Sequence, residues 1–248
     1  MVANWKMNGS AQIVANIVPT IIDFNVPDVR SVLCPPAVFL KLVAETIGSA
    51  EVFLGGQNCS SEKSGAFTGE ISPEMLANVG CRYVIIGHSE RRQLYSETNA
   101  IVGKKLVNAL KAGLIPICCV GETGEERGKG LTREVINRQI DSLFSALGTS
   151  SRGVKLELLI AYEPVWAIGT GESASPELAA ETHVLIRDRV AQHNEVVAET
   201  VKILYGGSVN EKNAGSFFEK NEIGGALIGG ASLKPHSFNE IRKLAAET

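Results

Sequence analysis

The run LIPICCV at residues 114–120 is apolar throughout and carries no charged side chain. A strand with one face in water alternates apolar and polar residues, so an unbroken apolar run predicts a strand that is buried on both faces. Strands of this kind are typical of parallel sheets that are covered by helices. The run therefore places the chain in the α/β class.

Seven more β-branched or apolar runs share this character, and each is followed by a polar or glycine-rich turn. They are MVANW at 1–5, RSVLC at 30–34, EVFLGG at 51–56, RYVIIG at 82–87, LELLIAY at 156–162, KILYGG at 202–207 and GALIGG at 225–230. Segments with helical periodicity lie between them, at 10–24, 37–48, 98–112, 131–147, 176–199, 211–220 and 232–246. Eight such units without a linker favour one (β/α)8 barrel domain over residues 1–248, and an open doubly wound sheet is the alternative.

The composition excludes several classes of protein. With 44% hydrophobic and 21% charged residues, the chain is expected to bury a sizeable core. A net charge of -3 gives no basic field, so we expect neither a nucleic-acid partner nor a membrane partner. The chain has no signal-like stretch and no apolar run of roughly 18 residues, and its five cysteines lack paired zinc spacing. We therefore expect a cytoplasmic protein without a metal.

Polar side chains follow several of the predicted strands. Asn4 and Lys6 come after the first strand, His88 and Glu90 after the fourth, and Glu163 after the sixth. Each has an ordinary structural interpretation on its own, such as a solvated lysine, a helix-capping histidine or a salt-bridged carboxylate. In a barrel, however, the loops after the strands share one rim, where active sites lie. Together these residues predict a functional site.

Two glycine pairs follow the last two strands, in Gly206-Gly207-Ser208 and in Gly229-Gly230. Bare backbone N–H groups that lead into helices can bind an anion, and barrels often hold phosphate after strands seven and eight. Tight turns without a ligand are the alternative. Neither a G-x-G-x-x-G fingerprint nor a P-loop occurs, so no nucleotide cofactor is expected.

A carboxylate and a histidine beside a bound phosphate suit proton transfer next to a carbonyl. The carboxylate takes a proton from carbon, while an imidazole N–H and a lysine stabilise the oxygen as an enediolate forms. This chemistry requires no cofactor. An enediolate with a neighbouring phosphate ester would lose the phosphate in water, so the site is expected to have a lid.

Seven motifs occur in order over essentially the whole chain. They are ANWKMNG at 3–9, QNCSSEKSGAFTGE at 57–70, YVIIGHSERR at 83–92, CVGE at 119–122, AYEPVWAIGTG at 161–171, LYGGSVN at 204–210 and LIGGASL at 227–233. Together they closely resemble the triosephosphate isomerase family. The resemblance implies a barrel enzyme of glycolysis and gluconeogenesis that interconverts D-glyceraldehyde 3-phosphate and dihydroxyacetone phosphate.

The same resemblance implies a role for each site residue. Glu163 would be the base and His88 the neutral electrophile, in a position where a helix N-terminus disfavours imidazolium. Lys6 would supply a fixed charge, oriented by Asn4 and paired with Glu90, which could also relay protons. The implied substrate and phosphate contacts are Asn4, Lys6, Ile168, Gly169, Gly171, Ser208, Leu227, Gly229 and Gly230. Ile168 and Leu227 would exclude water from Glu163 and so raise its pKa.

The resemblance also implies a lid over the site. Its first hinge would be Pro164, Val165 and Trp166, its tip Ala167, Ile168, Gly169, Thr170 and Gly171, and its second hinge Glu172, Ser173 and Ala174. Tyr205 and Ser208 would latch the closed lid. Glu172 departs from the family pattern, because a basic residue is common at that position.

A homodimer is implied by the stretch from 57 to 70, which resembles a loop that protrudes into a neighbouring subunit. Thr68 would approach Asn4 and His88 there, and Glu70 would pair with Arg91 between chains. The interface residues would be Gln57, Asn58, Phe67, Thr68, Gly69, Glu70 and Arg91. A polar surface loop is the alternative, although compact domains seldom carry a loop of this length without a function.

Two other functions remain open from the residues alone. Lys6 could form a Schiff base in a phosphosugar lyase or aldolase, but a lysine beside Glu90 is expected to keep its charge. A barrel that only binds a phosphosugar is the other possibility, and it would normally lack one of the site residues. Gly224 stands where many family members have an aspartate, which would leave Arg187 without that partner.

Overall fold

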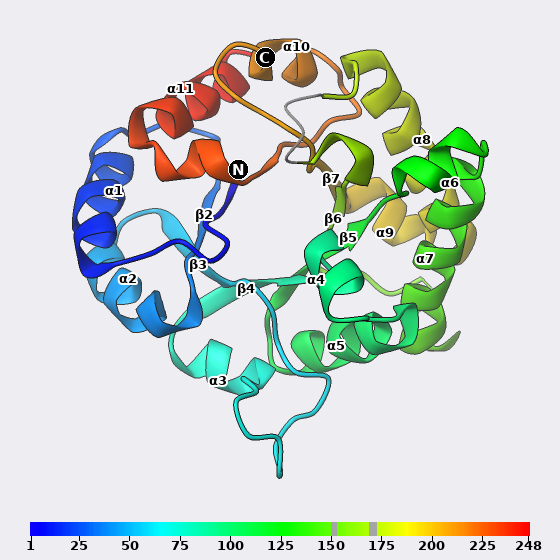
Figure 1. Cartoon of the computed structure of the whole chain (residues 1–248), viewed down its shortest axis with the longest axis horizontal. Helices are drawn as coiled ribbons and strands as arrows, with labels where there is room; N and C mark the ends of the chain where they lie inside the picture. The colour runs from blue at the N-terminus through cyan, green and yellow to red at the C-terminus, as the bar shows by residue number, and fades with distance from the viewer. Residues whose placement is uncertain (150–152, 169–172) are drawn as a thin grey trace.

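Eight parallel strands stand side by side in a ring, with helices outside them (Figure 1). The computed structural model describes residues 1–149, 153–168 and 173–248. The strands are β1 Val2–Asn4, β2 Ser31–Cys34, β3 Val52–Gly56, β4 Cys81–Ile86, β5 Ile115–Val120, β6 Leu159–Tyr162, β7 Lys202–Tyr205 and β8 Leu227–Ile228. The predicted (β/α)8 barrel is confirmed, and the open sheet is excluded.

The ring closes on both sides of β8. β1 pairs with β8 as well as with β2, whereas β7 meets the β8 segment at one bridge, between Tyr205 and Ala226. Near this bridge, the Tyr205 N–H donates to the Gly225 carbonyl at 2.9 Å, and the Gly224 N–H donates to the Ile203 carbonyl at 2.8 Å. The junction of β7 and β8 is therefore the shortest pairing in a nearly closed barrel.

Helices follow the strands around the outside of the barrel. They are α1 Ala11–Asp23, α2 Leu40–Ile47, α3 Pro73–Asn78, α4 Ser89–Leu94, α5 Asn99–Lys111, α6 Gly124–Gly128, α7 Thr132–Leu147, α8 Pro176–His193, α9 Glu195–Thr200, α10 Ala214–Phe218 and α11 Pro235–Ala246. Several begin where the sequence predicts: Ser10 caps α1, and Ser175 caps α8 with Pro176 at the first helical position.

The structure corrects two helix predictions and adds three short helices. The segment 176–199 is broken at Asn194, which leaves the helical conformation at φ -157° and accepts the Val197 N–H to cap α9. The segment 211–220 becomes helical only from Ala214, since the Asn210 and Asn213 side chains bind backbone groups of the preceding turn. The short helices α3, α4 and α6 were not predicted as segments because one or two turns give no clear periodicity.

Arg187 has partners despite the glycine at position 224. Its guanidinium donates to the carbonyls of Ala198 and Val201, where α9 ends. These bonds replace the carboxylate partner that the family pattern suggested. Gly224 offers no carboxylate, and the guanidinium is paired with these two backbone carbonyls.

The core has two parts, one inside the barrel and one between the strands and the helices. Along β5, Ile115, Ile117 and Cys119 belong to the inner cluster, whereas Cys118 and Val120 belong to the outer one. Alternate side chains of a strand point to opposite faces, so a strand between two apolar layers must be apolar at every position. This burial explains the unbroken run at 114–120.

Candidate active site

A cavity of about 470 Å³ opens at the carboxyl ends of the strands. Its lining includes most of the expected site residues in the described part of the chain: Asn4, Lys6, His88, Glu163, Ile168, Ser208, Leu227, Gly229 and Gly230. Gly169, Thr170, Gly171 and Glu172 lie outside the described residues. The barrel thus brings together side chains from five loops, as parallel strands in one ring require.

Glu163 directly follows β6, and its side chain is only 2% exposed. Its Oε2 accepts the Ser89 N–H at 2.9 Å, and its Oε1 lies 2.9 Å from His88 Nε2. Burial raises the pKa of Glu163, but His88 and the Ser89 N–H stabilise the carboxylate, and the net pKa lies below the usual range. In this arrangement the pKa of Glu163 is shifted downward, which is opposite to the rise that was expected.

His88 caps α4 and lies against Glu163. Its Nδ1 accepts the Glu90 N–H at 3.2 Å, so the ring proton is assigned to Nε2, which then donates to Glu163. Burial lowers the pKa of His88, but the adjacent carboxylate outweighs burial and moves the pKa above its usual value. Because this rise comes from Glu163, it depends on the carboxylate staying beside the ring.

Lys6 follows β1 in a left-handed backbone conformation, at φ 52°. Its N–H donates to Asn4 Oδ1 at 3.0 Å, and its Nζ lies 2.6 Å from Glu90 Oε1. The expected orienting and pairing contacts of Asn4 and Glu90 are therefore present. Gln57 Nε2 donates to the Lys6 carbonyl at 2.8 Å, so this predicted interface residue also supports the site within its own chain.

Close packing around the cavity requires glycine at positions 206 and 207, whereas the second pair is packed more loosely and a Cβ on Gly230 would meet no atom within 4 Å. A Cβ on Gly206 would lie 2.9 Å from Glu163 Cγ, and one on Gly207 would lie 2.2 Å from the Tyr205 hydroxyl. A Cβ on Gly229 would lie 3.3 Å from Lys6 Cε. The absence of these side chains leaves backbone at the cavity wall, which is the geometry that an anion site needs.

Glu122 holds the first hinge of the predicted lid through hydrogen bonds. This buried carboxylate accepts from Trp166 Nε1 at 3.0 Å and from the Tyr162 hydroxyl at 3.1 Å, and Arg127 stacks on the Trp166 ring at 4.7 Å. On the far side of the lid, the Tyr205 hydroxyl accepts the Ala174 N–H at 3.1 Å. This bond joins Tyr205 to the predicted second hinge, and its role as a latch stays a prediction.

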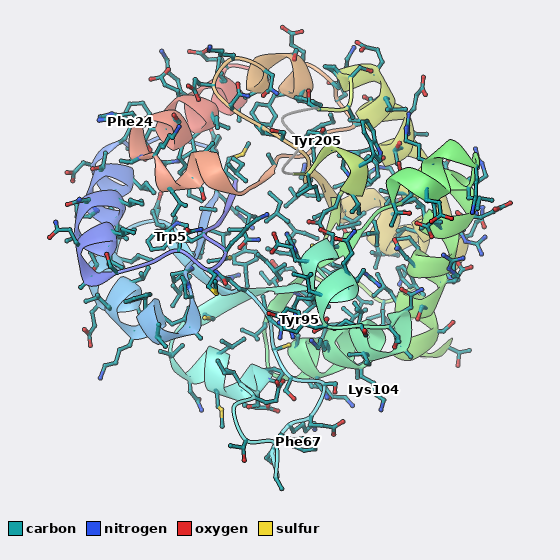
Figure 2. The ribbon with its side chains drawn as sticks, in the orientation of Figure 1. Trp5, Phe24, Phe67, Tyr95, Lys104 and Tyr205 are labelled. Atoms are coloured by element: carbon teal, nitrogen blue, oxygen red, sulfur yellow. The ribbon has the colours of Figure 1, made fainter. Side chains whose placement is uncertain are left out.

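The predicted interface loop leaves the barrel between β3 and α3 and extends away from it (Figure 1). Phe67 lies out on this loop, far from the ring of strands (Figure 2). At the base of the loop, Lys105 donates to Asn58 Oδ1 at 2.7 Å. Arg91, which was expected to pair with Glu70 between chains, is paired with Glu97 inside the chain.

Three residues beside the base received no role from the sequence. Ser89 holds the Glu163 carboxylate, Glu122 holds the hinge, and Gln139 binds the backbone of Gly121. The signal for Glu122 was the CVGE motif, which had no assigned function, and Ser89 lies in the YVIIGHSERR motif next to His88. Gln139 lies inside an amphipathic helix, where a buried polar residue gives no local signal.

The described residues show neither a metal-type cluster nor a membrane-spanning helix. Within residues 1–149, 153–168 and 173–248, no group of three or more His, Cys, Asp or Glu side chains is placed to hold a metal ion. Over the same ranges, no helix has the length and apolar character needed to cross a membrane.

The fold and the cavity define a (β/α)8 barrel with an acid–base pair and glycine-lined turns at the carboxyl ends of its strands. The triosephosphate isomerase family model matches residues 1–245, and the chain belongs to that family. Proteins named triosephosphate isomerase are similar over nearly their full length. The one from Herminiimonas arsenicoxydans is 46% identical, covering 98% of this chain and 97% of that protein. The one from Proteus mirabilis is 45% identical, covering 100% and 96%.

Proposed function

We propose that the chain interconverts D-glyceraldehyde 3-phosphate and dihydroxyacetone phosphate through an enediolate, as an enzyme of glycolysis and gluconeogenesis. The observation that carries the proposal is the contact between Glu163 and His88, 2.9 Å apart, in a cavity that also contains Lys6. The names of the relatives support the same reaction. We also propose that residues 1–248 form one catalytic domain, which acts in the cytoplasm without a cofactor.

Glu163 is proposed to move the proton between the two substrate carbons. The carboxylate removes a proton from one carbon and the C–H electron pair forms the enediolate. The hydroxyl proton then moves from one substrate oxygen to the other, and the protonated carboxyl returns a proton to the neighbouring carbon. Both Glu163 oxygens now accept N–H groups, from Ser89 and His88. Substrate must therefore replace these contacts, and the released His88 Nε2–H is then free to donate to the substrate oxygen.

Lys6 is proposed to stabilise negative charge on the substrate oxygen and phosphate. Its Nζ forms an ion pair with Glu90 Oε1 at 2.6 Å. A Schiff-base enzyme needs an uncharged amine at this position, so the contact supports the isomerase over the lyase or aldolase. The phosphate is proposed to bind at Ser208, Gly229 and Gly230, and under the lid tip at Gly171.

A homodimer is proposed through the loop at 57–70. A second cavity of about 450 Å³ lies beside the loop base and shares Lys6 and His88 with the active site. Exposed apolar side chains lie nearby, with Met7 96% and Tyr95 66% exposed. An apolar surface of this kind favours a protein partner. Sedimentation at micromolar concentration should give the mass of two chains, and a fully active monomer would contradict this interface.

The isomerase is tested by a coupled assay with glyceraldehyde 3-phosphate, followed by the same reaction in deuterium oxide. Proton transfer through a carboxylate that exchanges with solvent should place deuterium on the reacting carbon of the product. Turnover without deuterium would indicate a direct hydride shift and remove the role of Glu163. No turnover at all would refute the proposed activity.

A further inference from the structure

Gly121 lies in direct contact with the backbone of the proposed base. A Cβ on Gly121 would lie 1.7 Å from the Glu163 carbonyl oxygen and 2.6 Å from its carbonyl carbon. Real Cβ atoms do not approach other atoms so closely, so position 121 must be glycine while Glu163 keeps its place. The backbone just after β5 thus packs directly against the backbone of Glu163.

Backbone hydrogen bonds join the two segments on either side of this contact. The Glu163 N–H donates to the Val120 carbonyl at 2.7 Å, and the Val165 N–H donates to the Glu122 carbonyl at 3.1 Å. Any displacement of residues 120–122 would therefore carry the Glu163 backbone with it. The position of the base depends on what holds Gly121.

Gln139 of α7 holds Gly121 with both ends of its side-chain amide. The Gly121 N–H donates to Gln139 Oε1 at 2.8 Å, and Gln139 Nε2 donates to the Gly121 carbonyl at 3.1 Å. The pairing of β4 with β5 ends at Ile86 opposite Cys118, so β4 provides no ladder partner for Gly121. A neutral side chain that both donates and accepts takes the place of the missing strand.

We propose that Gln139 is a positioning residue of the isomerase, which sets the location of Glu163 through the backbone of Gly121. The inference rests on the proposed function, because it assumes that Glu163 is the base. Gln139 is only 7% exposed and does not line the active-site cavity, so it acts without touching substrate. A displacement of about 1 Å at a reacting group can lower a rate roughly 100-fold.

The test compares Gln139→Met with Arg187→Met. Methionine is close to glutamine in size but keeps neither hydrogen bond to Gly121. Arg187 also binds two backbone groups, the Ala198 and Val201 carbonyls, and lines neither the active-site cavity nor the second one. Both variants should lower the melting temperature. Only Gln139→Met should lower kcat, by about 10- to 100-fold, with KM and inhibition by inorganic phosphate within about twofold of wild type.

Unchanged kcat in Gln139→Met, or a kcat loss equal to that of Arg187→Met, would overturn the positioning role. If Gln139→Met does not fold, Gln139→Glu provides the test, because its carboxylate can still accept the Gly121 N–H but cannot donate to the carbonyl. It should lower kcat, and wild-type kcat would overturn the proposal.

Different experimental results would refute the proposed function and the positioning role of Gln139. Wild-type protein without isomerase activity, or Glu163→Gln with full activity, would refute the assignment of the base. An active wild type with an inactive Glu163→Gln and a fully active Gln139→Met would refute the positioning role alone.

Discussion

Glu163 and Lys6 face the same cavity but are held in opposite ways. Glu163 is almost fully buried and bonded to the Ser89 N–H and His88 Nε2, so its contacts are N–H donors on groups that need not be charged. Lys6 is 30% exposed and paired with the Glu90 carboxylate. The proposed base must gain and lose a proton, and neutral donors can be exchanged for substrate. The lysine has to supply a charge, and it is held as an ion pair with a carboxylate.

The backbones of the two residues differ as well. Lys6 is held at φ 52°, a conformation that costs an L-residue about 1 kcal/mol, and Gln57 binds its carbonyl. Glu163 directly follows β6 and lies against Gly121, which Gln139 binds. In both cases a glutamine side chain binds backbone where the sheet ends, so the rim is rigid without further strands.

Glu163→Gln should give the largest effect, because a neutral amide cannot accept a proton from carbon. We expect kcat to fall roughly 10³-fold while the fold and phosphate binding are retained. Steady-state kinetics measure kcat, and inhibition by inorganic phosphate measures phosphate binding. Activity equal to that of wild type would show that Glu163 is not the base, and the proposed difference in role between Glu163 and Lys6 would then be wrong.

Lys6→Met should rank second, since it removes a charge that stabilises the transition state but leaves the proton path intact. The expected loss in kcat/KM is about 10²-fold. Lys41→Met is the matched control, because Lys41 is exposed on α2 and its Nζ lies 3.9 Å from Glu45 Oε1. A loss in the control as large as in Lys6→Met would show that charge anywhere on the surface is sufficient.

Glu90→Gln should have a smaller effect, because the Lys6–Glu90 pair is partly solvated and such pairs contribute at most about 1 kcal/mol. The expected decrease in kcat/KM is less than about fivefold. The difference between the wild-type and Glu90→Gln rates should become smaller as ionic strength rises, because salt screens the Lys6–Glu90 pair. A decrease close to that of Glu163→Gln would assign Glu90 to the proton relay instead.

Ser89→Ala should give the smallest change. Its hydroxyl lies 3.4 Å from Glu163 Oε1, while the stronger bond from the backbone N–H is kept. The lost bond lets the pKa of Glu163 rise slightly, so kcat/KM should fall at acid pH by less than about threefold. The pH profile of kcat/KM measures this, and a profile displaced toward lower pH would contradict it.

The same bonds make a pH-dependent contribution to stability. The pKa of Glu163 is lowered in the folded protein, so its contacts stabilise the fold above the usual pKa of a glutamate. This contribution is lost as the pH falls through the lowered pKa. Unfolding measured across acid pH should therefore depend on pH less steeply in Glu163→Gln than in wild type.

The sequence predicted the architecture well because burial on two faces leaves a direct mark on composition. The run at 114–120 is apolar at each position since β5 lies between two apolar layers. Two helix starts agree with the predicted segments, which begin at 10 and 176, and the structure shows Ser10 and Ser175 as their caps. The break at Asn194 was missed because a helix pattern continues across it, and only the turn of the chain around the barrel requires the interruption.

The residues of the candidate site were also recognisable, because strand ends in a barrel share one rim and the motifs identify the family. The pKa direction of Glu163 was not predictable. It depends on whether burial or the N–H donors of Ser89 and His88 have the larger effect on this pKa. That balance is set by distances between residues far apart in the chain, such as Ser89 and Glu163, which are 74 positions apart.

By itself, the sequence determined the alternation of strands and helices, the glycine turns and the identity of the polar groups at the rim. These features are local, so each is recorded in a few neighbouring residues. The tertiary structure alone decided that Glu163 lies against Ser89 and His88 and that Gln139 binds Gly121. Such contacts join distant segments, and their geometry is fixed only when the whole barrel packs around them.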